Sequence, residues 1–261
     1  TRQRVALPAV LGGFGRSPLA FLRHAPLVLA LAGVPLFLLA LADPYTALTQ
    51  RRMSFPGRRI CIMIDASTSM VRWFEAPTLR AASNTKPGGS EAAFFTTVAA
   101  AERFIRVRME GKYRDLISLV EFGDSAYVVT PFTSDYDNIL LSLSLIGDFG
   151  EFLRFPDQGT MIARAIEQGT RLFRNFNFLE ASGNILLLFS DGEDAGVITQ
   201  GKSISEVIHD AREAKIPVYM VRVNHDKKMG GIIPDAIWKA AIEQTGGKFY
   251  AAATEDTILQ A

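Results

Sequence analysis

Five oxygen-bearing side chains in this sequence stand where an apolar run ends or where a helix begins. Asp65, Ser67 and Ser69 follow the run RICIMI, Thr160 stands at the start of a helical stretch, and Asp191 follows the run NILLLFS. Alternate residues of an extended segment point to the same side, so Asp65, Ser67 and Ser69 can share one side of their loop. Three hydroxyls with only two carboxylates suit a hard, octahedral ion better than a Ca²⁺ cage. We therefore predict a Mg²⁺ site at these five residues, with Mn²⁺ and Ca²⁺ as alternatives.

The elements that must position these residues alternate between strands and helices. This alternation predicts an α/β domain with a six-stranded, mainly parallel sheet and helices on both faces. One strand, 126–132, would be the antiparallel member of a hairpin. Ligands of such sheets bind beyond the carboxyl ends of the parallel strands, where all five residues are expected. The predicted strands are 59–64, 115–123, 126–132, 184–190, 217–223 and 248–253; the predicted helices are 91–109, 135–146, 161–175, 203–214 and 234–245.

The segments 71–90 and 147–160 are predicted to be loops. The second contains three phenylalanines, Phe149, Phe152 and Phe155. We expect these rings to pack beneath the loop, and a contact surface near Thr160 is the alternative.

An apolar segment precedes this domain. Residues 25–42 carry no charge and would extend about 27 Å as a helix, close to the roughly 30 Å hydrocarbon core of a bilayer. They predict a transmembrane helix, with a buried core helix or a signal peptide as alternatives. The predicted organisation is a juxtamembrane segment 1–24, this helix, a linker 43–57 and a domain 58–261. Arginines are balanced on the two sides of the helix, so the positive-inside rule does not decide its orientation.

Composition excludes several classes of function. The sequence has 28 lysines and arginines against 27 acidic residues, which gives no electrostatic argument for nucleic-acid binding. Its single cysteine, Cys61, lies in an apolar run and cannot form an intramolecular disulfide. The sequence lacks a nucleophile elbow and a phosphate-binding glycine loop. We therefore expect a binding protein and not an enzyme.

The five residues also carry a family resemblance. Their order, Asp-x-Ser-x-Ser, then Thr after Gly, then Asp-Gly, resembles the metal-ion-dependent adhesion site of the von Willebrand factor A (VWA) domain. The resemblance covers roughly residues 56–261 and implies a Rossmann-like VWA fold. It implies that Ser67 and Ser69 bind the metal directly, as does Thr160 in the ligand-bound form. Asp65 and Asp191 would act mostly through water, and an Asp or Glu of a protein partner would fill the open coordination position. The alternative is that Ser67 and Asp191 only cap local turns.

An apolar helix that ends in Ala-Asp-Pro at 42–44, directly before such a domain, is similar to bacterial aerotolerance-type (Bat-like) membrane proteins. That likeness implies a location at the cell inner membrane, with the VWA domain in the periplasm. It implies a MoxR-type AAA+ ATPase as partner and a role in assembly or maturation of a cell-envelope or membrane complex. Two alternatives are a structural subunit of a large membrane complex and an ATPase-associated, chelatase-like subunit. Glu193 and Asp194, next to Asp191, are expected to be solvated or to form a turn.

Overall fold

The computed structural model describes residues 24–41, 55–79, 92–193, 201–223 and 233–261. Contacts within the chain divide it into two compact units, Thr1–Arg52 and Met53–Ala261. The predicted segment 1–24 and linker 43–57 lie mostly outside the described residues, as do most of the predicted loop 71–90 and Asp194.

The described part of the first unit is one apolar helix, α1 (Ala25–Leu41), of 17 residues with Pro35 inside it. None of its residues is buried. A membrane-spanning helix needs about 20 apolar residues. Among the described residues, no helix combines the length and the apolarity that crossing a bilayer requires. The prediction of a transmembrane helix over 25–42 is therefore not confirmed.

The second unit is built on a six-stranded sheet with the order β3-β2-β1-β4-β5-β6. All neighbouring strands are parallel except β2 and β3, which form an antiparallel hairpin. The predicted sheet is thus confirmed, including its antiparallel member. The strands are β1 (Phe55–Asp65), β2 (Tyr113–Phe122), β3 (Ala126–Thr133), β4 (Asn184–Ser190), β5 (Val218–Val223) and β6 (Phe249–Ala252).

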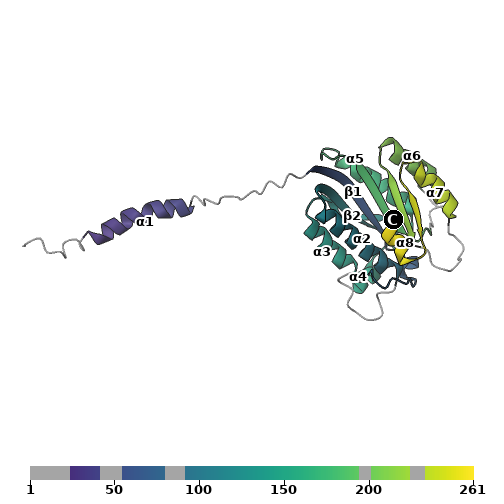
Figure 1. The fold of residues 1–261 in the computed structure, drawn as a ribbon, viewed down its shortest axis with the longest axis horizontal. Coiled ribbons are helices and arrows are strands. Elements are labelled where there is room, and N and C mark those ends of the chain that lie inside the picture. The colour runs from purple at the N-terminus through teal and green to yellow at the C-terminus, as the bar shows by residue number, and fades with distance from the viewer. Residues whose placement is uncertain (1–23, 42–54, 80–91, 194–200, 224–232) are drawn as a thin grey trace, which may run out of the picture. The chain divides into compact units, whose positions relative to one another are not determined.

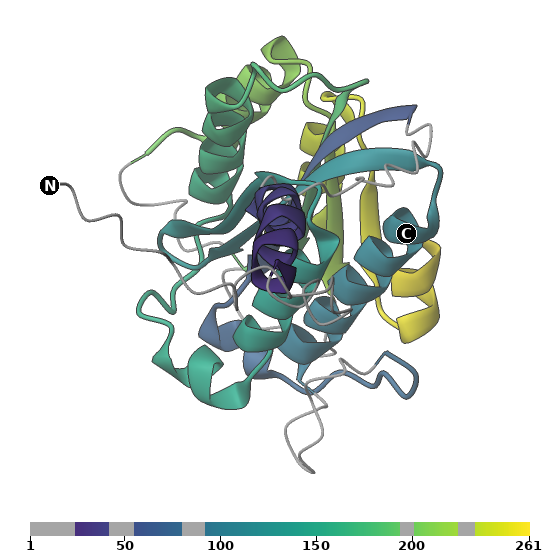
Figure 2. The same ribbon diagram turned by 90° about the vertical axis from the view of Figure 1, so that its left-hand side faces the viewer.

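Helices cover both faces of the sheet, as Figures 1 and 2 show. Residues of α2, α3, α4 and α8 share one buried cluster, whereas residues of α5, α6 and α7 share a second cluster across the sheet. The predicted three-layer arrangement is confirmed. The helices are α2 (Ala93–Glu110), α3 (Tyr136–Ile146), α4 (Phe149–Arg154), α5 (Ile162–Asn175), α6 (Ile204–Glu213), α7 (Asp235–Glu243) and α8 (Glu255–Gln260).

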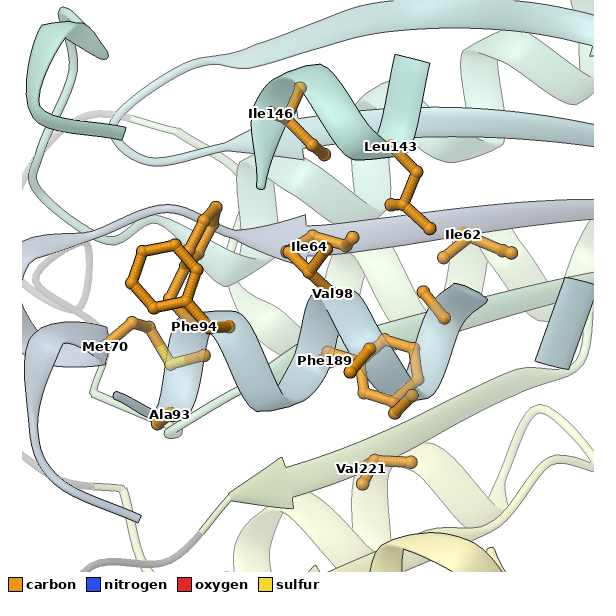
Figure 3. Close-up of a cluster of buried hydrophobic side chains, with 14 of the residues drawn as sticks. Ile62, Ile64, Met70, Ala93, Phe94, Val98, Leu143, Ile146, Phe189 and Val221 are labelled. Carbon is orange, nitrogen blue, oxygen red and sulfur yellow. The ribbon is translucent and has the colours of Figure 1, made fainter. Parts of the chain in front are cut away.

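Strand β1 is buried on both faces because it lies inside a parallel sheet. Ile62 and Ile64 belong to the cluster under α2, and Figure 3 shows their side chains among those of α2 and α3. Cys61 and Met63 alternate with them and belong to the other cluster. Cys61 is fully buried, and burial raises the pKa of its thiol to about 12. This thiol is a small core residue and not a nucleophile at neutral pH.

The segment 147–160 is not entirely a loop, which corrects the sequence prediction. It contains α4, whose N-cap Asp148 accepts a hydrogen bond from the Gly150 N–H. The sequence obscured this helix because it is only 6 residues long and includes a glycine, which lowers helix propensity. Phe152 is 2% exposed and its ring centroid lies 4.4 Å from that of Phe94 in α2. Packing beneath the segment, the expected arrangement, is confirmed for Phe152 and for Phe155, which is 9% exposed, but it is wrong for Phe149, which is 46% exposed because it lies at the outer start of this short helix.

Candidate metal centre

Asp65 ends strand β1 at the carboxyl edge of the sheet and is fully buried. Its Oδ1 accepts a hydrogen bond from the Ser67 N–H at 2.9 Å, and its Oδ2 accepts one from Ser190 Oγ at 2.5 Å. Ser190 is the last residue of β4, the strand that pairs with β1. These two bonds hold the Asp65 carboxylate between two neighbouring strand ends.

Ser67 and Ser69 lie in the loop that follows β1. Their hydroxyl oxygens are 3.0 Å apart, so the two side chains do converge as the alternation predicted. A short 3₁₀ helix, η3 (Thr68–Val71), begins directly after Ser67. Met70 of η3 is fully buried, and Figure 3 shows it beside Phe94 at the start of α2. This apolar anchor fixes the backbone that presents the two hydroxyls.

Thr160 lies just before α5 and is 6% exposed. The backbone N–H of Thr68 donates to the carbonyl oxygen of Gln158 at 3.0 Å. The N–H of Met161 donates to the carbonyl oxygen of Gly123, also at 3.0 Å. The first bond ties the Thr160 loop to the loop of Ser67 and Ser69, and the second ties it to the end of β2.

Asp191 follows β4 and is 2% exposed. Its side-chain Oδ1 accepts a hydrogen bond from the Glu193 N–H at 3.0 Å, and its carbonyl oxygen accepts one from Arg222 Nε at 3.0 Å. Gly192 has a φ of +80°, and a Cβ there would come within 2.9 Å of Arg222 Nε. A glycine at this position therefore permits both the left-handed turn and the close approach of Arg222.

The buried carboxylates of Asp65 and Asp191 both lie at this edge and repel one another electrostatically. Burial, and secondarily the charge of Asp191, raise the pKa of Asp65 to about 7, although hydrogen bonds from Ser190 and Ser67 act in the opposite direction. A raised carboxyl pKa means that the surroundings disfavour the negative charge. The site is consequently short of positive charge, and a cation bound beside Asp65 would stabilise its ionised form.

The rim of the site carries an ion pair between the residue that follows η3 and the segment after β4. Arg72 Nη1 lies 2.6 Å from Glu193 Oε1, and both side chains are about one-quarter exposed. The Glu193 N–H closes a turn onto Asp191 Oδ1, as the turn-forming alternative predicted, and its side chain is in addition paired with Arg72. The turn was visible from the spacing, but Arg72 lies far away in the chain and only the fold brings it to Glu193.

Sequence reasoning placed all five predicted residues at or beside the same sheet edge, but it missed Ser190 and Arg222. Ser190 immediately precedes Asp191 in the motif FSDGED, so its adjacency was a usable signal. The signal for Arg222 was weaker: it is the single charged residue in the apolar run VYMVRV, near the end of that run. Ser190 Oγ donates to the Asp65 carboxylate, and Arg222 Nε donates to the backbone carbonyl oxygen of Asp191.

The donor set fits a hard divalent cation. Within the described part of the chain, no three His, Cys, Asp or Glu side chains gather in a metal-binding arrangement. An ion at this edge would therefore depend on hydroxyl oxygens, and the paired hydroxyls of Ser67 and Ser69 with buried carboxylates behind them supply such a set. Oxygen-only coordination is what Mg²⁺, Mn²⁺ and Ca²⁺ prefer.

A protein-family model for the von Willebrand factor type A domain matches residues 60–193, from the start of the buried part of β1 to the rim glutamate. This chain belongs to the VWA family. The matched segment contains all five predicted site residues. No curated protein matches the chain significantly.

Solved structures share the VWA fold. BatB from Bacteroides thetaiotaomicron is 18% identical with a TM-score of 0.56, and the match covers 78% of this chain and 94% of BatB. An aerotolerance-related membrane protein from Bacteroides fragilis is 18% identical with a TM-score of 0.51, covering 78% and 96%. Proximal thread matrix protein 1 from the mussel byssus has a zinc-occupied MIDAS (metal-ion-dependent adhesion site) motif. It is 13% identical with a TM-score of 0.51, and the match covers 79% of this chain and 46% of the mussel protein.

Proposed function

We propose that this VWA domain is a protein-interaction module that binds a partner carboxylate through Mg²⁺. Ser67, Ser69 and Thr160 would hold the ion, and Asp65 and Asp191 would provide the negative charge behind it. The bound ion would supply a positive centre for an Asp or Glu of the partner. The protein's own residues orient the hydroxyls, keep the carboxylates buried and tie the three loops together.

One observation carries this proposal: the hydroxyls of Ser67 and Ser69 lie 3.0 Å apart beside Asp65, whose pKa is raised to about 7. A purely structural aspartate at a strand end would gain stability from a positively charged partner. Asp65 instead has serine donors on both oxygens and Asp191 as its electrostatic neighbour. This combination favours an ion-binding role over simple capping of local turns.

Calorimetric titration of the full chain with MgCl₂ tests the metal site. Wild type should bind, and Asp65→Ala should not. Ser67→Ala is the second variant, because it removes one hydroxyl and leaves the backbone N–H bonded to Asp65. Asp137→Ala, in the exposed first turn of α3, is the matched control and should bind as wild type does. Undiminished Mg²⁺ binding by Asp65→Ala and Ser67→Ala would refute the assignment.

A pull-down from solubilised membranes tests the interaction role. Wild type and Asp65→Ala are compared in Mg²⁺ and then in EDTA. A partner lost from the variant and from the chelated sample supports metal-dependent docking. A partner retained in both would instead favour the structural-subunit function, and an ATPase retained in both would favour the chelatase-like one.

We also propose that the chain acts at the bacterial inner membrane, with the VWA domain in the periplasm and a MoxR-type AAA+ ATPase as a partner, in the assembly or maturation of a cell-envelope or membrane complex. Two features support attachment through α1: the helix buries none of its apolar residues, and one structural neighbour is described as a membrane protein. Deletion of 25–41 should release the domain from the membrane fraction. Continued sedimentation with membranes would contradict attachment through this helix.

A further inference from the structure

Glu121 is a buried acid at the carboxyl end of β2 that the metal site does not use. It shares its face of the strand with Ile117 and Leu119, which are fully buried in the cluster under α2 and α3. Glu121 itself is only 9% exposed. Among the described residues, no hydrogen bond or ion pair reaches its carboxylate, and burial raises its pKa to about 7. Buried carboxylates without a partner are uncommon because of their desolvation cost.

This carboxylate lines a pocket of about 370 Å³. The apolar part of the lining comes from Leu145 and Ile146 at the end of α3 and from Phe155 and Pro156 after α4. The pocket therefore has apolar walls and one acidic group, which is the complement of a long side chain with a positively charged end.

The pocket is open to solvent at a charged rim. Arg154 and Glu151 also line it, and they pair with one another at 2.7 Å with side chains that are 77% and 54% exposed. An exposed pair of this kind contributes little stability. Arg154 is engaged with Glu151 and does not neutralise Glu121.

The pocket is next to the candidate metal centre in the chain and in the fold. Phe155 and Pro156 lead directly into the segment that ends at Thr160, and β2 continues into Gly123, whose carbonyl oxygen accepts from the Met161 N–H. A partner docked at the metal could thus reach the pocket with a neighbouring side chain.

We propose that this pocket binds the ammonium group of a lysine side chain of the partner protein, with Glu121 as its counter-ion and the apolar walls around its methylene stem. The partner would then present a lysine near the acidic residue that binds the metal. The identity of the partner rests on the proposed function, whereas the preference of the pocket for an ammonium group does not.

The test is a titration of the full chain with Nα-acetyl-lysine N-methylamide in the presence of EDTA. Changes in the NMR chemical shifts of the protein measure binding. The norleucine analogue, which has the stem without the ammonium group, is the control ligand. We expect saturable binding in the millimolar range, as its small size implies, and at least roughly tenfold weaker binding by Glu121→Gln. Glu243→Gln, an exposed position in α7 that does not line the pocket, is the matched control and should change the affinity less than about threefold. Glu121→Asp keeps the charge and should retain measurable binding.

Three results would overturn the proposal: no saturable binding by wild type, equal binding of the norleucine analogue, or unchanged affinity of Glu121→Gln. The first of these results, combined with binding by Arg154→Gln, would show that Arg154 fills the pocket in solution. Because the titration is made without metal, its failure is independent of whether Mg²⁺ binds at Ser67 and Ser69.

Discussion

Buried charged groups are paired with partners at the amino ends of the central strands, whereas they are less fully compensated at the carboxyl ends. At the amino end, the guanidinium of Arg59 donates to Asn184 Oδ1 at 3.0 Å and to the carbonyl oxygen of Phe176 at 2.8 Å. Asp115, fully buried, accepts from the Arg58 N–H at 2.8 Å and from Arg108 Nε at 2.5 Å.

At the carboxyl end, two buried acids, Asp65 and Glu121, have raised pKa values. Asp65 has serine donors and Asp191 as an electrostatic neighbour, and burial raises the pKa of Glu121 to about 7. Removing one partner of a buried, paired charge is strongly destabilising because the other charge is left uncompensated. Carboxylates with raised pKa values are instead characteristic of functional sites. The amino end of the sheet is therefore the structural end, and we expect the carboxyl end to bind partners.

The largest expected effect lies at the matched end. Asp115→Ala removes the acceptor for Arg108 and for the Arg58 N–H, and should lower the free energy of unfolding by about 3 kcal/mol. Urea denaturation measures this change, with Asp137→Ala as a control near zero. Mg²⁺ binding by the folded fraction should be unchanged. A loss no larger than that of the control would mean that the amino end is not the structural one.

Next in size is a pH effect at Glu121. Its folded pKa of about 7 lies above its ordinary value, so the folded state holds a proton that the unfolded state releases between about pH 4.5 and 7. Stability should therefore fall as pH rises through this window, by roughly 2–3 kcal/mol from this group. Glu121→Gln should remove that part of the pH dependence in urea denaturation at several pH values. An identical pH profile for the variant would contradict the assignment.

A smaller effect of opposite sign to that of Asp115→Ala is expected at Asp191. Asp191→Asn removes one of the two negative charges that raise the cost of burial, so it should stabilise the metal-free protein by roughly 1 kcal/mol at neutral pH. The same change should weaken Mg²⁺ binding. Thermal unfolding with and without Mg²⁺ separates the two effects. Destabilisation of the metal-free protein would place Asp191 with the matched, structural charges.

The smallest effect is expected at the rim. The Arg72–Glu193 pair is partly exposed, and exposed pairs contribute about 1 kcal/mol or less. Glu193→Gln should accordingly change stability by less than about 1 kcal/mol and leave Mg²⁺ affinity within roughly threefold. Calorimetry on this variant checks both numbers. A loss of Mg²⁺ binding as complete as that of Asp65→Ala would make Glu193 part of the metal centre.

Local patterns in the sequence determined much of this molecule. Apolar runs predicted all six strands, the alternation with helices predicted the parallel sheet, and the hydroxyl spacing after β1 predicted the convergence of Ser67 and Ser69 that is now seen at 3.0 Å. These features depend on near neighbours in the chain, where side-chain period and turn chemistry act directly. Helix α4 was not predicted because a helix of 6 residues shows little apolar periodicity.

Tertiary structure alone decided how charge is distributed around the site. Ser190 reaches Asp65 across 125 residues because β4 lies beside β1 in the sheet. Strand pairing likewise brings Arg222 of β5 to the carbonyl oxygen of Asp191. Glu121 was a single charge in an apolar run, and only the packing of α3 and the end of α4 against β2 shows that it lines a pocket. Residue types and spacing specify which groups are available, but burial and long-range pairing determine their pKa values and partners, because both depend on which strands and helices become neighbours.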